Sequence, residues 1–485
     1  MTGARLPRDG AMTLFSSSPV TAAATLDVSA GWALQCTAFD APTPDQLRVQ
    51  ADVLVCVNAQ GVIDAVLQPD DPRWARERAA HAAAGTLRAL PAGSYLLPGM
   101  VDLHVHAPQW PQNGKALDVP LEVWLQDNTF PLEARYSDAA FAQSVYDVVV
   151  PTLLANGTTT AMYFGTVDNA GNQVLAERCL AHGQRALVGK VAMDEPTQCP
   201  PYYKDASAAQ AVADTEAFMD WLRTHPDNAQ QRVLPVITPR FIPSCTDALL
   251  QGLGDLAQRT GAHVQTHCSE SDWAHGHVLE RTGTTDAHAL HKFGLMTRRT
   301  VVAHANFLTP DDVALMARMG ASVAHCPLSN FYFANSVFPA RSGNQQALGM
   351  GLATDISGGY SPSMFDACRH AMTAALALHE GTDPDQPSTA RGRAAQGHPA
   401  KIDHVFALWL ATAAGGQALD LPIGRIEPGY AMDAIAVDCT APDSNIWLWD
   451  GEDSDADVLQ KIIHNATRAN VAQVWVQGQR VHART

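Results

Sequence analysis

Two histidines separated by one residue end the apolar segment Pro98-Gly99-Met100-Val101-Asp102-Leu103-His104-Val105-His106. On a β-strand, residues two apart point to the same face, so the imidazoles of His104 and His106 leave the backbone together. Two neighbouring imidazoles provide half of a tetrahedral metal site. Such a pair is more often incidental than functional when it stands alone. The metal interpretation therefore depends on further ligands elsewhere in the chain.

The middle of the chain alternates apolar, strand-like runs with helical stretches such as Ala139–Val150 and Asp311–Met319. This alternation is typical of parallel βα units, and eight units predict an α/β fold of the (β/α)8, TIM-like barrel type. The eight expected strands are Gly99–His106, Thr158–Tyr163, Ala186–Met193, Val233–Pro239, His263–His267, Thr300–His304, Ala321–His325 and Gly349–Asp355.

Polar residues stand where these expected strands end. Because the carboxyl ends of barrel strands meet at one mouth, where barrel enzymes carry their active sites, we expect these side chains to converge. They are His104, His106, Arg240, His267, His304 and Asp355.

Hydrolytic zinc requires three or more nitrogen or oxygen ligands and a position for water. We predict that His104, His106, His267 and Asp355 are the ligands of one zinc ion per subunit. The same ligand types suit iron, so the sequence leaves the metal's identity open. Lys190 lies within the third expected strand rather than at the end of the fourth, which does not support a second metal bridged by a modified lysine.

Three residues are predicted to be catalytic. Glu270 follows His267 by three residues and is expected to act as general acid and base toward a ring nitrogen. His304 is expected to polarise the attacking water or to stabilise a developing oxyanion. Asp355 is expected to accept the proton that the water releases when the metal lowers its pKa.

Both ends of the chain are rich in short strand-like runs. Ala51–Val57 and Val62–Val66 predict a hairpin, and Ala434–Asp438 and Val471–Val476 resemble strands, the second closed by Gly478. We therefore predict a small β-sandwich domain formed by both termini, from residues 29–97 and 425–485, beside a barrel of residues 98–424. Residues 1–28 lack periodicity and are expected to form a flexible N-terminal tail.

Composition excludes several classes of function. The net charge of −17 argues against nucleic-acid binding, which requires clustered cations. No apolar run approaches the length of a membrane-spanning helix, so no membrane partner is expected. Nine dispersed cysteines without a CxxC pair suggest free thiols in a reducing compartment, and we expect a cytoplasmic enzyme.

These segments together resemble the amidohydrolase superfamily of metal-dependent hydrolases. The resemblance rests on Pro98–Gln109, Phe130–Glu133, Asn156–Phe164, Thr238–Phe241, His267–Glu270, Ala324–Asn330 and Gly351–Ser361. The metal motifs are general to the superfamily. The runs His-Ala-Pro-Gln, Thr-Pro-Arg-Phe and Gly-Gly-Tyr-Ser are narrower and are similar to those of the guanine deaminase branch.

The resemblance implies zinc-dependent hydrolysis of guanine to xanthine and ammonia by a homodimer, as a step of purine catabolism. Gln109 and Arg240 would bind the purine's carbonyl and ring nitrogens, and Phe241 would pack on the ring. Trp110 stands where this branch usually carries tyrosine. The implied substrate-binding residues are His106, Gln109, Trp110, Arg240, Phe241, His267, His304 and Asp355.

Two alternatives to guanine remain open at this point. The same metal site could serve a related enzyme that acts on 8-oxoguanine, a pterin or a triazine. A non-catalytic barrel scaffold is the other alternative, although such a scaffold is expected to lack one or more metal ligands. The charge of Arg240 favours a purine with a carbonyl over one with an amino group at position 6.

Overall fold

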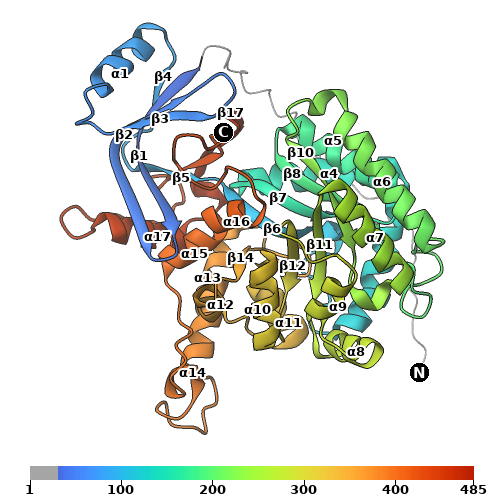
Figure 1. Cartoon of the computed structure of the whole chain (residues 1–485). Helices are drawn as coiled ribbons and strands as arrows, with labels where there is room; N and C mark the ends of the chain where they lie inside the picture. The colour runs from blue at the N-terminus through green and yellow to red at the C-terminus, as the bar shows by residue number, and fades with distance from the viewer. Residues whose placement is uncertain (1–30, 485) are drawn as a thin grey trace, which may run out of the picture.

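A computed structural model describes residues 31–484, which form a parallel barrel and a separate sheet beside it (Figure 1). The tail predicted for residues 1–28 lies outside the described residues. The prediction of a TIM-like barrel with a small β domain from both ends of the chain is confirmed in its architecture.

The barrel strands follow one another around the barrel in chain order, and every pair is parallel. Most are buried along their whole length, as expected for a parallel sheet covered on both faces. The strands are β6 (Met100–His106), β7 (Thr158–Phe164), β8 (Arg185–Gly189), β10 (Val233–Pro239), β11 (His263–Cys268), β12 (Thr300–His304), β13 (Ser322–His325) and β14 (Gly349–Leu352).

The first strand and the chain just after the last strand close the barrel. The backbone N–H of Asp355 donates to the carbonyl of His104 at 3.0 Å, and that of His106 donates to Ile356 at 2.7 Å. The carboxylate of Asp102 accepts bonds from the backbone N–H and the hydroxyl of Thr354 at 3.0 and 2.5 Å. Closure therefore occurs at the level of the predicted metal ligands.

Two barrel strands differ from the prediction. The third strand is interrupted at Lys190. The two-residue strand β9 (Val191–Ala192) follows the break and pairs with the end of β10. The fully buried ammonium of Lys190 forms an ion pair with Asp205, which lies in the loop before α6. The eighth strand ends at Leu352 rather than Asp355, and Asp355 itself adopts a positive φ of 53°, which is outside the range of a strand.

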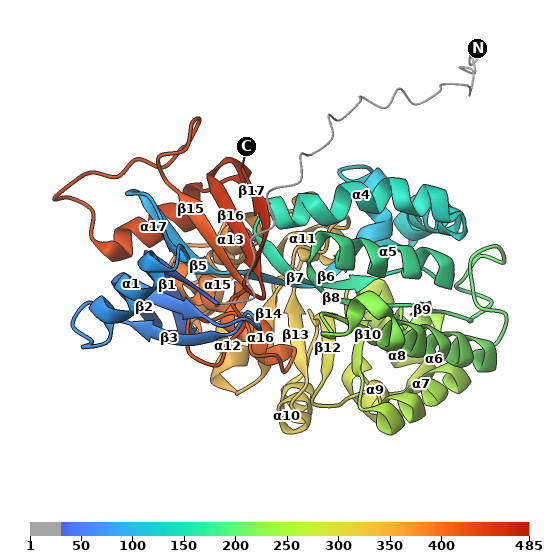
Figure 2. The ribbon, with the colours of Figure 1, turned by 90° about the horizontal axis from the view of Figure 1, so that it is seen from above.

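Helices follow the barrel strands and cover the outside of the barrel (Figure 2). Several begin at a side-chain cap, such as Asp138 before α4 and Thr309 before α10. The helices between β6 and α16 are α2 (Leu121–Trp124), α3 (Phe130–Glu133), α4 (Ala139–Ala155), α5 (Asn169–His182), α6 (Ala208–Thr224), α7 (Asp247–Thr260), α8 (Asp272–Thr282), α9 (Asp286–Lys292), α10 (Pro310–Met319), α11 (Pro327–Ala334), α12 (Ala340–Gln345), α13 (Met364–Glu380), α14 (Gly392–Ala395), α15 (His404–Ala411) and α16 (Ala413–Ala418).

The second sheet joins the two ends of the chain in the order β17-β16-β15-β5-β1-β2-β3, with β4 paired to β1. The predicted hairpin forms between β2 and β3, and β15 lies antiparallel to β5. Helices α1 (Trp74–Ala83) and α17 (Asp455–Asn465) flank this sheet. Its strands are β1 (Trp32–Thr43), β2 (Gln46–Val57), β3 (Ile63–Leu67), β4 (Leu87–Ala89), β5 (Ser94–Pro98), β15 (Ala434–Asp438), β16 (Val471–Val476) and β17 (Gln479–Ala483).

The two sheets meet where β5 leads into β6 at Gly99. A Cβ atom on this residue would lie 2.1 Å from the hydroxyl oxygen of Thr159, so only glycine fits. Asp433 accepts the N–H of Gly99 through its carbonyl at 2.9 Å and forms an ion pair with Arg185 at 2.8 Å through its carboxylate. The exact domain boundaries, 29–97 with 425–485 and 98–424, stay a prediction.

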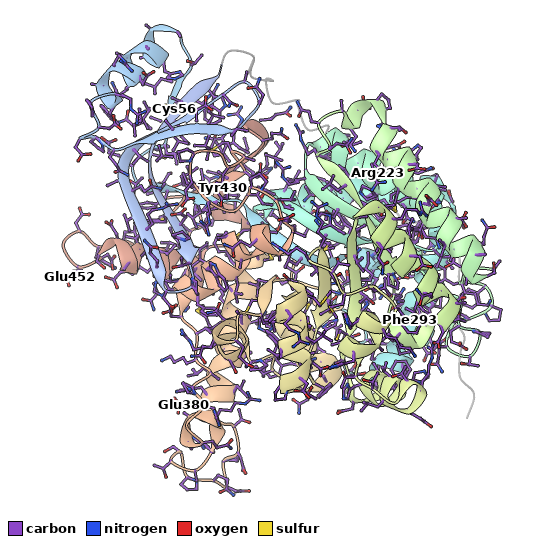
Figure 3. All side chains as sticks on the ribbon, viewed as in Figure 1. Cys56, Arg223, Phe293, Glu380, Tyr430 and Glu452 are labelled. Atoms are coloured by element: carbon purple, nitrogen blue, oxygen red, sulfur yellow. The ribbon has the colours of Figure 1, made fainter. Side chains whose placement is uncertain are left out.

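One segment projects from the body of the protein. It leaves α13 at Glu380 and carries α14 (Figures 1 and 3). Within residues 31–484, no helix combines the length and the apolar composition that crossing a bilayer requires.

The Arg185–Asp433 pair yields a stability prediction. Asp433→Ala should lower the free energy of unfolding by about 3 kcal/mol, because it leaves the guanidinium of Arg185, only 12% exposed, without its partner. Denaturant unfolding followed by circular dichroism measures the loss. As a control, Glu77→Ala removes the partner of Arg76, which is 72% exposed, and should leave the midpoint unchanged. Equal effects would contradict a structural role for the buried pair.

Candidate active site

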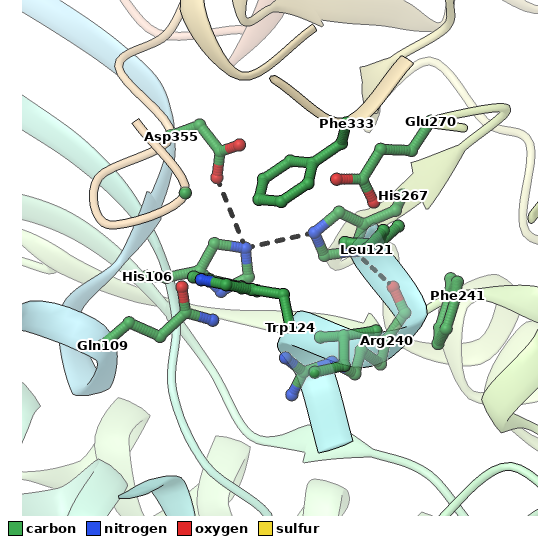
Figure 4. A pocket seen from close by; sticks show the side chains of 12 residues that line it. His106, Gln109, Leu121, Trp124, Arg240, Phe241, His267, Glu270, Phe333 and Asp355 are labelled. Carbon is green, nitrogen blue, oxygen red and sulfur yellow. Dashed lines mark hydrogen bonds and ion pairs between the residues drawn. The ribbon is translucent and has the colours of Figure 1, made fainter. Parts of the chain in front are cut away.

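The four predicted metal ligands converge at the mouth of the barrel, although they lie far apart in the sequence. His104 and His106 end β6, His267 lies near the end of β11, and Asp355 follows β14. The Nε2 atoms of His104 and His106 lie 3.2 and 3.6 Å from Oδ1 of Asp355. The Nε2 atoms of His106 and His267 are 3.1 Å apart (Figure 4).

The environment keeps these ligands in metal-binding forms. Burial lowers the pKa of all three imidazoles well below the ordinary value, and the neighbouring imidazoles lower the pKa values of His106 and His267 further. All three rings are therefore neutral near pH 7 and carry a free lone pair. Burial raises the pKa of Asp355 to about 6, and this carboxyl group is mainly ionised at neutral pH.

The cluster fits a divalent zinc ion. Ligands 2.0–2.1 Å from a tetrahedral ion lie about 3.3 Å from one another. The His104–Asp355, His106–Asp355 and His106–His267 pairs, at 3.2, 3.6 and 3.1 Å, are close to this spacing, whereas within residues 31–484 no group of candidate ligand atoms within 4.8 Å of one another contains both His267 and Asp355. The Nε2 atom of His104 is buried and has no hydrogen-bond partner among the described residues, as expected for a ligand whose partner is an ion. Three neutral imidazoles and one carboxylate form a typical donor set for this metal.

Hydrogen bonds behind the cluster orient its members. Nδ1 of His267 lies 2.7 Å from the carbonyl of Arg240 and must donate to it, which leaves the lone pair on Nε2, toward the cluster. Nδ1 of His304 lies 3.0 Å from the side-chain oxygen of Asn330 in the same way. The buried Nε2 of His304 has no partner among residues 31–484.

Glu270 lies beside the candidate metal ligands. Its Oε1 is 3.5 Å from Nε2 of His304. Burial and the nearby Asp355 raise the pKa of Glu270 well above its ordinary value, so the side chain holds a proton that it can donate. The loop is fixed on both sides, since Ser269 donates its backbone N–H to Asp286 at 3.1 Å and Asn306 donates its amide to the carbonyl of Glu270 at 2.9 Å.

A small pocket opens onto this cluster (Figure 4). Polar groups line one part of it, and apolar side chains from α2, the following turn and α11 line the rest. Its lining residues are His106, Gln109, Leu121, Trp124, Leu125, Arg240, Phe241, His267, Glu270, Phe333, Asp355 and Gly358.

The structure places most, but not all, of the predicted substrate-binding residues at this pocket. Gln109, Arg240 and Phe241 line it together with four of the predicted metal ligands and catalytic groups, His106, His267, Glu270 and Asp355. His304 lies deeper, within the metal cluster. Trp110 does not line the pocket. Its partly buried ring packs against the apolar cluster that contains Val105 and Tyr136, so the geometry gives no support to a substrate contact for this side chain.

Sequence reasoning missed Glu133, a buried carboxylate beside the pocket that contacts both Arg240 and Gln109. This residue ends α3 and is 1% exposed, and its carboxylate forms an ion pair with Arg240 at 2.6 Å. It also accepts hydrogen bonds from Gln109 and Tyr203 at 2.9 and 2.8 Å. In the sequence, Phe130–Glu133 is only one of the segments that carry the family resemblance, and this motif does not identify the partners of its carboxylate.

Comparisons with known proteins agree with this geometry. A sequence profile of the Amidohydrolase family matches residues 95–481. The chain is 34% identical over 403 residues to a probable guanine deaminase of Schizosaccharomyces pombe, covering 82% of this chain and 73% of that protein. It is 35% identical over 406 residues to the guanine deaminase of Mus musculus, covering 81% and 84%.

A solved structure gives the same result for the fold. The guanine deaminase of C. acetobutylicum with bound guanine in the active site superposes with a TM-score of 0.81 at 25% identity, covering 93% of this chain and all of that chain. The match of the family profile extends over most of the sequence and includes every predicted metal ligand. This protein is a member of the amidohydrolase family.

Proposed function

We propose that the protein is a guanine deaminase, a hydrolase that cleaves the exocyclic C–N bond of guanine to give xanthine and ammonia. One observation carries the proposal: a metal-type cluster and the Gln109–Arg240 pair face the same small pocket. The names of the relatives at 34–35% identity support it.

His104, His106, His267 and Asp355 would hold one zinc ion in each subunit. The ion would supply a hydroxide nucleophile at neutral pH, because it lowers the pKa of water to about 7. All four side chains are buried, so few water molecules can compete with them for coordination of the ion.

The protein's own groups would manage the protons of the reaction. Glu270 holds a proton beside the cluster and would transfer it to the ring nitrogen next to the carbon that water attacks. Loss of that proton leaves a carboxylate that can take one from the attacking water and pass it to the departing amino group. His304, with its free Nε2 atom 3.5 Å from Glu270, would orient the attacking water.

Gln109, Arg240 and Phe241 would recognise the purine. Arg240 is a permanent cation with several N–H donors, which suits the 6-carbonyl of guanine and disfavours a 6-amino group. Phe241 lines the pocket and would pack on the flat ring.

The proposal also includes domain boundaries at residues 97 and 424, a homodimer and a cytoplasmic location. The dimer rests on the family resemblance, and the location is supported by nine free cysteines.

Metal removal tests the proposed centre. Purified protein should convert guanine to xanthine and ammonia and contain about one equivalent of zinc per chain by elemental analysis. Chelator treatment should abolish turnover, and one added equivalent of zinc should restore it, because the metal supplies the nucleophile. Full turnover by a preparation free of metal would reject the centre, and an inactive zinc-loaded protein would reject guanine as the substrate.

The role of Glu270 can be tested separately from metal binding. Glu270→Gln keeps the size of the side chain but removes the transferable proton, and turnover should fall by about 10²–10⁴-fold. The zinc content and the thermal midpoint should match those of the unsubstituted protein, since Glu270 is not a proposed ligand. Unchanged turnover would remove Glu270 from the mechanism.

A further inference from the structure

The buried carboxylate of Glu133 connects the two side chains that are proposed to recognise the substrate. Nη1 and Nη2 of Arg240 donate to it at 2.6 and 3.2 Å, and Nε2 of Gln109 donates at 2.9 Å. The hydroxyl of Tyr203 donates at 2.8 Å to Oε2 of Glu133, whereas Gln109 contacts Oε1. Glu133 does not line the pocket itself, so any effect on the substrate must pass through these partners.

This contact determines which end of the Gln109 amide faces the pocket. A carboxylate can only accept hydrogen bonds, so the amide group that contacts Glu133 must be the NH₂ donor. The Oε1 atom of Gln109 is then left over, and it is buried without a partner among the described residues. Gln109 is only 1% exposed and lines the pocket, and it therefore presents an unsatisfied acceptor there.

The same carboxylate balances and orients the cation of Arg240. A guanidinium that is 3% exposed would be strongly destabilised without a counter-charge. The ion pair and the ring of Phe130, 5.0 Å from the guanidinium carbon, hold the group in place. Two Nη atoms contact Glu133 but carry four hydrogens, so donors remain for a ligand.

We propose that Glu133 is a positioning residue that sets the hydrogen-bonding polarity of the pocket. By holding Gln109 as an acceptor next to the donors of Arg240, it makes the pocket complementary to a ring edge with an N–H beside a carbonyl. The inference rests on the proposed function, because guanine has this edge at N1 and C6. A purine with an unprotonated ring nitrogen beside an amino group presents the opposite pattern and leaves buried groups unpaired.

2,6-Diaminopurine has this opposite pattern and is a suitable probe. The test compares the KM and kcat of guanine with the inhibition constant of 2,6-diaminopurine in wild type and Glu133→Gln. The glutamine can donate as well as accept, so the Gln109 amide is no longer held in one orientation. We expect the KM for guanine to rise about tenfold or more relative to the inhibition constant of 2,6-diaminopurine, with a smaller change in kcat.

Tyr203→Phe is the matched control. It removes one hydrogen bond to the same carboxylate but leaves the contacts of Gln109 and Arg240 intact. The ratio of the two constants should stay within about threefold of wild type, since a single neutral hydrogen bond contributes about 1 kcal/mol. A shift in Tyr203→Phe as large as that in Glu133→Gln would indicate general loosening of the site and overturn the proposal.

The outcomes separate this inference from the proposed function. Wild type that does not turn over guanine rejects the function itself, whereas an unchanged ratio in Glu133→Gln with active wild type rejects only the role of Glu133. If Glu133→Gln does not fold, Gln109→Ala replaces it. Removal of the acceptor should weaken the binding of guanine about tenfold relative to that of 2,6-diaminopurine. Equal weakening of the binding of both compounds would overturn the inference.

Discussion

The active site depends on backbone hydrogen bonds that close the barrel between β6 and the chain after β14. These bonds join His104 to Asp355 and His106 to Ile356, and they bring a carboxylate to two imidazoles that lie about 250 positions earlier in the chain. Asp102 strengthens the closure through Thr354. Because the alternation of a strand sends His104 and His106 to one face, closure in this register is sufficient to assemble three of the four proposed ligands.

Burial then gives different chemical roles to the groups that closure brings together. Removal from water disfavours every charged form, so it keeps His104, His106 and His267 neutral and keeps a proton on Glu270. One physical cause therefore prepares both the metal ligands and the acid. The guanidinium of Arg240 stays charged in the same environment because Glu133 accompanies it. In this pocket, the buried groups without a partner of opposite charge are therefore neutral, and the guanidinium that has such a partner is charged.

The sequence was sufficient to predict the barrel and the positions of the polar residues at its mouth, because strand periodicity and strand ends are local patterns. Contacts between connecting segments were not predictable in this way. Glu133 and Arg240 are separated by 107 positions. Glu133 ends the short helix α3, and Arg240 directly follows the strand β10. The buried ammonium of Lys190 likewise pairs with Asp205, whose place in a loop no periodicity reveals. Pairing partners of buried charges therefore required the fold.

Gln109 and Trp110 show how finely the local backbone separates binding from packing. Both lie in the 3₁₀ helix η1 (Ala107–Gln112), in which successive side chains diverge by about 120°. Gln109 consequently enters the pocket, whereas the ring of Trp110 packs on the cluster around Val105 and Tyr136. The ring of Trp110 therefore fills space in this apolar cluster and not in the pocket. The proposed recognition of the purine edge then rests on Gln109, Arg240 and the carboxylate of Glu133, which contacts both.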